Sequence, residues 1–229
     1  MADSPSLKFK DNLEEVYQLM AMHGVLAGAG PGRKHRVEVL NKSAVLFACA
    51  SFEAFIEDLA RRSFDHLVLK STDHTTLPKA ILKSIAETLR NDKNELKIWD
   101  LAGNGWRTVA EHYKQSMILK HIGPFNTPKP HNIESLLKEL TGFPETYPVW
   151  RWRGMNAAAS KKKLKDFVEL RGSLAHGNKP AAPVLKKDVV GYIKFLAILS
   201  VRLSNDMCDY CLKITGEEPW DWAIYKTIE

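Results

Sequence analysis

The clearest helical repeat in the chain lies in residues 184–214, VLKKDVVGYIKFLAILSVRLSNDMCDYCLKI. Apolar side chains recur in this segment at steps of three and four residues, which places them on one face of an α-helix. These side chains are Leu185, Val189, Tyr192, Leu196, Leu199, Leu203, Met207 and Tyr210. A helix of this length with one apolar face predicts an all-α bundle in which long helices form the core.

The same periodicity predicts the other helices, and no segment alternates between apolar and polar residues as a half-buried strand would. The expected helices span residues 13–26, 45–69, 77–89, 106–119 and 133–140. Glycines and prolines divide residues 91–155 into short pieces. We therefore expect a single domain over residues 1–229, with an insertion or elaborated connection at about 91–155. A small second lobe there is the alternative.

Composition is that of an ordinary soluble protein, with 45% hydrophobic and 26% charged residues and a net charge of +6 over 229 residues. The positive surplus favours acidic partners such as nucleic acid. Three cysteines suit a reducing compartment, and Cys208 and Cys211 are interpreted as packing thiols, not a zinc site. Residues 1–10 lack the apolar core of a signal peptide, and the longest apolar stretches are too short to span a bilayer. We expect a cytoplasmic protein that is not in a membrane.

A second helical run, residues 161–170, leads into an arginine at an unexpected position. Leu164, Val168, Arg171 and Ala175 follow one another at steps of four, three and four residues, so they share one helix face. A charged side chain on an apolar face needs a partner or a function. His176 follows immediately before a glycine that is expected to end the helix. A cation and an imidazole at one helix end suit phosphodiester chemistry.

The segment Arg171-Gly172-Ser173-Leu174-Ala175-His176-Gly177 resembles the R-x4-6-H signature of the HEPN superfamily. Residues 51–59, SFEAFIEDL, are similar to the long early helix of its RiboL-PSP-HEPN branch. The resemblance covers most of the chain, although residues 91–155 match poorly. It implies a HEPN-like helical bundle that acts as a metal-independent endoribonuclease without a cofactor. It also implies a homodimer in which two motifs line a shared cleft, and a toxin or antiviral-defence setting with an antitoxin or defence-system partner protein.

The residue types of this motif fit RNA cleavage. RNA carries its own nucleophile, the 2′-hydroxyl group, so an enzyme needs to move protons and stabilise charge. His176 is the candidate for proton transfer, because imidazole exchanges protons near neutral pH. Arg171 is the candidate for binding the phosphate as negative charge builds on it. In the alternative interpretation Arg171 pairs structurally, His176 caps the helix, and the protein is a non-catalytic HEPN module that binds RNA, nucleotide or a protein partner.

Three further residues are candidates for supporting this pair. The family often carries a polar residue directly after the motif arginine, whereas this chain has Gly172. Ser173 or Asn178 is the candidate for supplying the missing polar group. Glu53, at the margin of the apolar stripe of residues 45–69, is the expected ion-pair partner of Arg171. A solvated glutamate at the helix edge is the alternative.

Basic clusters near the motif are candidates for tracking an RNA backbone. The candidate RNA-binding residues are Lys161, Lys162, Lys163, Lys165, Lys186 and Lys187, and residues 33–36 form a further basic loop. Ordinary solvated helix faces are the alternative use of such runs. Aromatic rings alternate with cations in the segment Trp150-Arg151-Trp152-Arg153. This pattern is used to stack unpaired bases, and the alternative is that it anchors the inserted segment on the bundle. We expect no metal site, since no ligand set has suitable spacing.

Overall fold

The computed structural model describes residues 3–27, 37–121, 127–145, 148–176 and 183–223. This part of the chain is helical and contains no strand, which confirms the predicted all-α fold. The α-helices are α1 (Pro5–Ala27), α2 (Glu38–Lys70), α3 (Lys79–Arg90), α4 (Gly105–His121), α5 (Pro130–Thr141), α6 (Ala157–Ala175) and α7 (Lys186–Thr215). Two short 3-10 helices, η2 (His74–Thr76) and η3 (Glu95–Leu101), flank α3.

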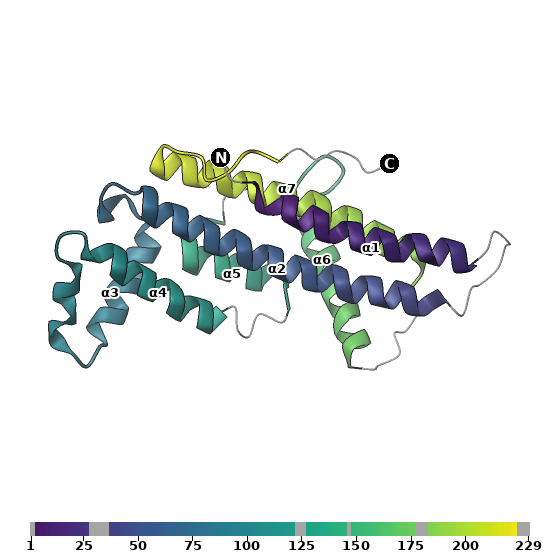
Figure 1. Cartoon of the computed structure of the whole chain (residues 1–229), viewed down its shortest axis with the longest axis horizontal. Coiled ribbons are helices and arrows are strands. Elements are labelled where there is room, and N and C mark those ends of the chain that lie inside the picture. The colour runs from purple at the N-terminus through teal and green to yellow at the C-terminus, as the bar shows by residue number, and fades with distance from the viewer. Residues whose placement is uncertain (1–2, 28–36, 122–126, 146–147, 177–182, 224–229) are drawn as a thin grey trace.

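The three longest helices, α1, α2 and α7, lie side by side and carry most of the core (Figure 1). Cys49, Phe52 and Ile56 of α2 are fully buried among them, as are Leu199 and Met207 of α7. Leu185, which the repeat placed on the buried stripe, is exposed because it lies at the N-cap of α7 rather than within the helix. The long helices form the core as the periodicity predicted.

By length and composition alone, α2 is apolar enough to cross a membrane. Half of the side chains in its 18-residue apolar window are buried inside the protein. Burial of this kind is typical of the central helix of a bundle, which packs against neighbours on more than one side.

The middle segment packs onto the same core as the long helices. Trp106 and Ala110 of α4 and Ile133 and Leu140 of α5 are buried in one continuous apolar cluster with α2 and α7. A buried ammonium group adds a polar tie, because the Nζ atom of Lys114 lies 2.6 Å from carboxylate oxygens of both Asp65 and Glu111.

A tight turn after α5 fixes this segment against its neighbours. Gly142 adopts a left-handed conformation with φ of 73°. A Cβ atom at this position would lie 2.5 Å from the Cβ atom of Pro78 and 3.0 Å from the hydroxyl oxygen of Tyr210. Glycine is therefore required here by both its backbone angle and the close approach.

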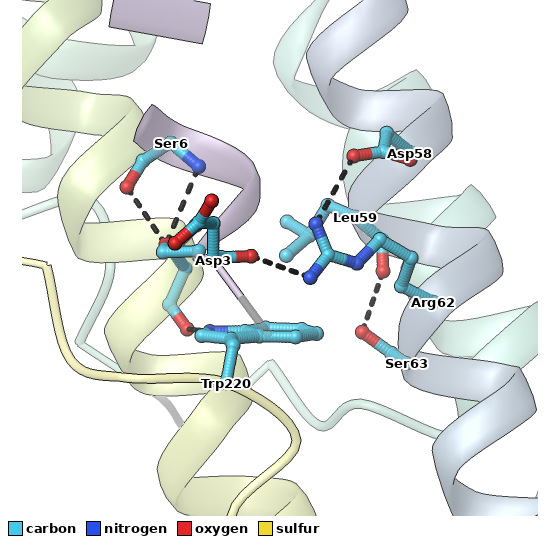
Figure 2. A network of polar contacts seen from close by, with 9 residues as sticks. Asp3, Ser6, Asp58, Leu59, Arg62, Ser63 and Trp220 are labelled. Carbon is cyan, nitrogen blue, oxygen red and sulfur yellow. Dashed lines mark hydrogen bonds and ion pairs between the residues drawn. The ribbon is translucent and has the colours of Figure 1, made fainter. Parts of the chain in front are cut away.

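A single arginine of α2 ties together two distant ends of the described chain (Figure 2). Arg62 donates a hydrogen bond to the backbone carbonyl of Asp3 and pairs with Asp58 at 3.6 Å. Its guanidinium lies over the ring of Trp220, 5.4 Å from the centroid. Trp220 is fully buried, and its indole N–H donates to the carbonyl of Ser204 on α7. The start of α1 and the segment after α7 are thereby held against the same turn of α2.

Candidate functional site

The motif arginine lies where α6 crosses α2. Its Nη2 atom is 3.9 Å from the Oε1 atom of Glu53, and the two side chains are 25% and 14% exposed. The structure thus brings together the two residues that were expected to pair. The spacing is long for a hydrogen bond, so the contact is a loose ion pair, and the guanidinium donates no hydrogen bond to the described residues.

Arg171 is less buried than its place on an apolar stripe suggested. Along α6, Leu164 and Val168 are buried, Arg171 is half-buried, and Ala175 is exposed. The reason is visible in Figure 1, where the C-terminal end of α6 projects away from the long helices. The stripe continues past the point where the bundle covers it, so its last positions face solvent.

Glu53 lies in a partly apolar environment that disfavours the ionised form of its carboxyl group. Burial raises the pKa of its carboxyl group, and the nearby Arg171 and a hydrogen bond from Cys49 oppose that rise. The thiol of Cys49 donates to Glu53 at 3.7 Å. Burial and the adjacent Glu53 raise the pKa of this thiol to about 12, so it remains protonated and is not a nucleophile.

Cys49 was not identified as part of the site from the sequence. The signal that could have found it is its position four residues before Glu53, which places both side chains on one face of α2. A thiol that donates to the carboxylate helps to hold the side chain of Glu53 where Arg171 reaches it.

His176 stands at the exposed end of α6. It is the C-cap residue, and its backbone N–H donates to the carbonyl of Gly172 at 3.2 Å. Five residues correspond to about 140° around an α-helix beyond one full turn, so Arg171 and His176 leave α6 on different sides. Arg171 faces α2, whereas His176 is open to solvent. A substrate that touches both side chains must therefore pass around the end of the helix.

The residues between them leave room for such a substrate. A Cβ atom built on Gly172 would meet nothing within 4 Å. The hydroxyl of Ser173 donates to the carbonyl of Leu170 at 2.8 Å, so its oxygen can still accept a hydrogen bond but its proton is in use. Asn178 lies outside the described residues. The backbone of α6 is bare next to the motif arginine.

Most of the candidate RNA-binding lysines on α6 already have acidic partners. Lys161 pairs with Glu134 at 2.5 Å, and the neighbouring i,i+4 pairs are Lys162–Asp166 at 2.6 Å and Lys165–Glu169 at 3.7 Å. Lys163 instead lies beside the rings of Tyr192 and Phe195, at 6.0 and 5.3 Å from their centroids. These pairs reduce the positive charge that α6 offers to an RNA backbone.

The two remaining candidate lysines lie at the start of α7. Lys186 and Lys187 at the start of α7 are exposed, and no carboxylate in the described ranges pairs with them. The basic loop at residues 33–36 lies outside the described part of the chain.

The positive charge of the chain is concentrated around the motif. Residues 149–200 contain eleven lysines and arginines and three acidic residues, which leaves twenty-two basic and twenty-four acidic residues elsewhere. The whole positive surplus of the protein therefore lies in the segment that carries α6 and the first half of α7. This asymmetry is readable from the sequence, and a local excess of positive charge favours acidic partners.

The tryptophans before α6 anchor the chain. Trp150 is 6% exposed and belongs to the core, so it is not available to stack a base. Trp152 is half-buried, and its ring lies 5.9 Å from that of Phe195 on α7. Arg151 and Arg153, by contrast, are exposed.

Within the described residues, no group of three or more histidine, cysteine, aspartate or glutamate side chains comes together in a way that could hold a metal ion. Cys208 and Cys211 are buried and free, in agreement with packing thiols.

Comparison with known protein families identifies a match over most of the chain. The family model described as RiboL-PSP-HEPN matches residues 11–209, which includes the middle segment as well as the motif. No curated protein and no solved structure matches the chain. The match spans most of the 229 residues and confirms the resemblance indicated by residues 51–59 and 171–177. The chain belongs to the RiboL-PSP-HEPN family, a branch of the HEPN superfamily.

Proposed function

We propose that this protein is a metal-independent endoribonuclease. HEPN modules are often ribonucleases, and the family match gives the proposal its starting point. The observation that carries it is the arrangement at the end of α6. An arginine that donates no hydrogen bond to the described residues and an exposed histidine flank an open stretch of helix backbone, in the most positively charged part of the sequence.

In this proposal the 2′-hydroxyl group of RNA attacks the adjacent phosphorus atom and expels the 5′-oxygen of the next nucleotide. His176 accepts the proton of the hydroxyl or donates one to the leaving oxygen. Arg171 donates hydrogen bonds to the phosphate oxygens as their charge increases. Glu53 holds the guanidinium from the α2 side and directs its free edge away from the core. The products carry a 2′,3′-cyclic phosphate, or the 3′-phosphate formed from it, and a 5′-hydroxyl.

We further propose that the active form is a homodimer whose contacts include α6 and α7. The motif of one chain supplies one arginine and one histidine. These two side chains leave α6 on different sides. A two-fold axis near the end of α6 would place the arginine of one copy opposite the histidine of the other in a shared cleft. Light scattering at micromolar concentration tests this. A monomer that still cleaves RNA would contradict the shared-cleft dimer.

The family resemblance also supports a setting as a toxin or antiviral-defence effector in the cytoplasm, restrained by an antitoxin or defence-system partner protein. This setting belongs to the proposal. A test is to express the chain with and without the product of a neighbouring gene and to compare the growth of the cells.

The decisive experiment for activity is incubation of the purified protein with RNA in the presence of a chelator. Cleavage should persist, and His176→Ala should slow it by about 10²–10⁴-fold through loss of proton transfer. His112→Ala is the matched control, because His112 is exposed on α4, away from the motif. Cleavage that stops with chelator, or that survives in His176→Ala, contradicts the mechanism. RNA that is bound but never cut would favour a non-catalytic HEPN module.

A further inference from the structure

We propose that the turn at residues 151–155 is a second RNA contact, an exosite that binds single-stranded RNA at a distance from the cleavage site. This inference rests on the proposed function in taking RNA as the substrate. It adds a separate binding surface, carried by Arg151 and Arg153, that lies before α6 and outside the R-x4-6-H motif.

The turn is closed by its own backbone. Trp152 and Met155 exchange two backbone hydrogen bonds, at 3.0 and 2.9 Å, and Gly154 between them has a left-handed φ of 82°. A turn closed on both sides has few alternative conformations, so its side chains are presented in fixed directions.

Both flanks of the turn are fixed to the bundle. The ring of Trp152 packs against Phe195, and Trp150 is buried in the core. Arg202 on α7 donates to the carbonyl oxygens of Val149 at 3.2 Å and Pro148 at 2.9 Å. An ordered loop pays less conformational entropy when it binds a ligand, which favours a built binding surface over a free strand of chain.

Within the part of the chain that the structure describes, the two arginines of the turn have no acidic partner. Arg151 and Arg153 are exposed on either side of Trp152, and no carboxylate in the described ranges lies within ion-pair distance of them. The lysines of α6 differ, since Lys161, Lys162 and Lys165 are each paired. A planar guanidinium can bind a phosphate through two parallel hydrogen bonds and can also stack on a base. The turn therefore presents two exposed guanidinium groups that no carboxylate of the described ranges occupies.

The position of the turn relative to the motif suggests a path for RNA. Lys163 lies beside Phe195, the same ring that packs against Trp152, so it marks where the turn meets α6. From there to His176 the helix rises about 20 Å at 1.5 Å per residue, which is the length of several nucleotides. Exposed lysines recur along this path at Lys162 and Lys165. A single strand with splayed bases can follow such a path and contact both ends.

The test measures binding with cleavage removed. In the full chain carrying His176→Ala, Arg151→Ala and Arg153→Ala are combined, and the affinity for labelled single-stranded RNA is measured by fluorescence anisotropy. One RNA is long enough to span the turn and the end of α6, and a second covers only the end of α6. The matched control combines Arg90→Ala and Lys93→Ala. Arg90 is the last residue of α3 and Lys93 follows it, both are exposed, and the pair removes the same charge as the turn variant.

We expect the long RNA to bind the turn variant about tenfold more weakly than it binds the His176→Ala parent. It should bind the control variant as tightly as the parent. The slope of log affinity against log salt should fall by about 1.4, because each single-strand phosphate contact contributes about 0.7. The short RNA should bind alike to both. Equal weakening of the long RNA in both variants, or equal weakening of both RNAs in the turn variant, overturns the exosite.

The result is independent of whether the protein proves to be a nuclease. If the parent chain does not cleave RNA but the turn variant loses affinity for the long strand, the binding surface stands and the proposed activity fails. If cleavage is found but the turn variant binds like the control, the activity stands and the exosite fails. Circular dichroism of each variant verifies that the helices are intact.

Discussion

Two arginines, one on α2 and one on α6, have almost the same exposure and very different surroundings. The side chain of Arg62 is 29% exposed and that of Arg171 is 25% exposed. Arg62 donates to a backbone carbonyl, pairs with Asp58 and lies over the ring of Trp220 (Figure 2). Arg171 has one loose contact at 3.9 Å, with Glu53, and no hydrogen bond from its guanidinium is found among the described residues.

The difference shows that burial alone does not separate a structural arginine from one that binds a ligand. A guanidinium has five N–H donors. At Arg62 they are directed at groups that the fold must hold together. At Arg171 none of them forms a hydrogen bond to a residue that the structure describes, and the space beside Gly172 is open. The number of donors in use is the more informative quantity, and it can be tested at both positions.

The largest effect should come from Arg171→Ala. Loss of the guanidinium should slow RNA cleavage by about 10²–10³-fold, as expected for a group that stabilises transition-state charge. The free energy of unfolding should change by less than about 1 kcal/mol, since the ion pair with Glu53 is loose and partly exposed. Initial rates and urea unfolding measure the two effects. A variant that loses stability while it retains activity would make Arg171 a second structural arginine.

Arg62→Ala should show the opposite pattern. Removal of its hydrogen bond and its contact with Trp220 should lower the free energy of unfolding by about 1.5–3 kcal/mol. The cleavage rate should be unchanged at temperatures where the variant is folded. Arg61→Ala is the control, because Arg61 is its exposed neighbour and should change stability by less than about 0.5 kcal/mol. Equal stability of the two variants would contradict the structural role.

The open space beside Arg171 can be filled without unfolding α6. Gly172→Leu should reduce cleavage by roughly tenfold or more, because the leucine side chain would displace an RNA backbone from the helix. Gly172→Ala should retain activity and raise the free energy of unfolding by about 0.5–1 kcal/mol through better helix propensity. Ala86→Leu, at an exposed position on α3, controls for the added side chain. Full activity of Gly172→Leu would show that RNA does not approach there.

The smallest effect is a pH dependence at Glu53. Burial raises the pKa of its carboxyl group in the folded state, so the folded state holds this proton more tightly than the unfolded state does. The wild type should therefore lose stability relative to Glu53→Gln as the pH rises. The loss should begin near the ordinary carboxyl pKa of 4.5 and be complete above the raised pKa of the folded state. We expect a difference of less than about 1 kcal/mol, since Arg171 partly offsets the cost. Urea unfolding from pH 4 to 7 measures it; a wild type that gains stability with pH would reverse the sign.

Much of the fold could be predicted because each long helix repeats its apolar residues at helical spacing. The beginning of α6 could not be placed this way. It lies at Ala157, because the side chain of Asn156 accepts a hydrogen bond from the backbone N–H of Ala159 and caps the helix. The capping residue was present in the sequence, but the helix was predicted from its lysine-rich run at residues 161–170.

The candidate site was predictable to a different degree at each residue. Glu53 and Arg171 were expected to meet because Arg171 lies on the apolar stripe of its helix and Glu53 at the margin of another, and they do meet. The projection of α6 beyond the bundle depends on how helices from distant parts of the chain pack, so the exposure of Arg171 could not be predicted. The pairing of Lys162 with Asp166 follows i,i+4 spacing and was available in the sequence.

The tie at Arg62 has a consequence for how the chain folds. Its bond to Asp3 closes a separation of 59 residues, and α2 is joined to α7 through the bonds of Asn41 to Val184 and of His66 to Thr215, across 143 and 149 residues. Helical proteins usually fold fast because their contacts are local, and folding slows as contacts become more distant in sequence. Helices α1 and α2 can pair early, but the apolar face of α2 must wait for α7. During that interval this face is exposed to other chains, so the folding step most open to aggregation is the arrival of α7.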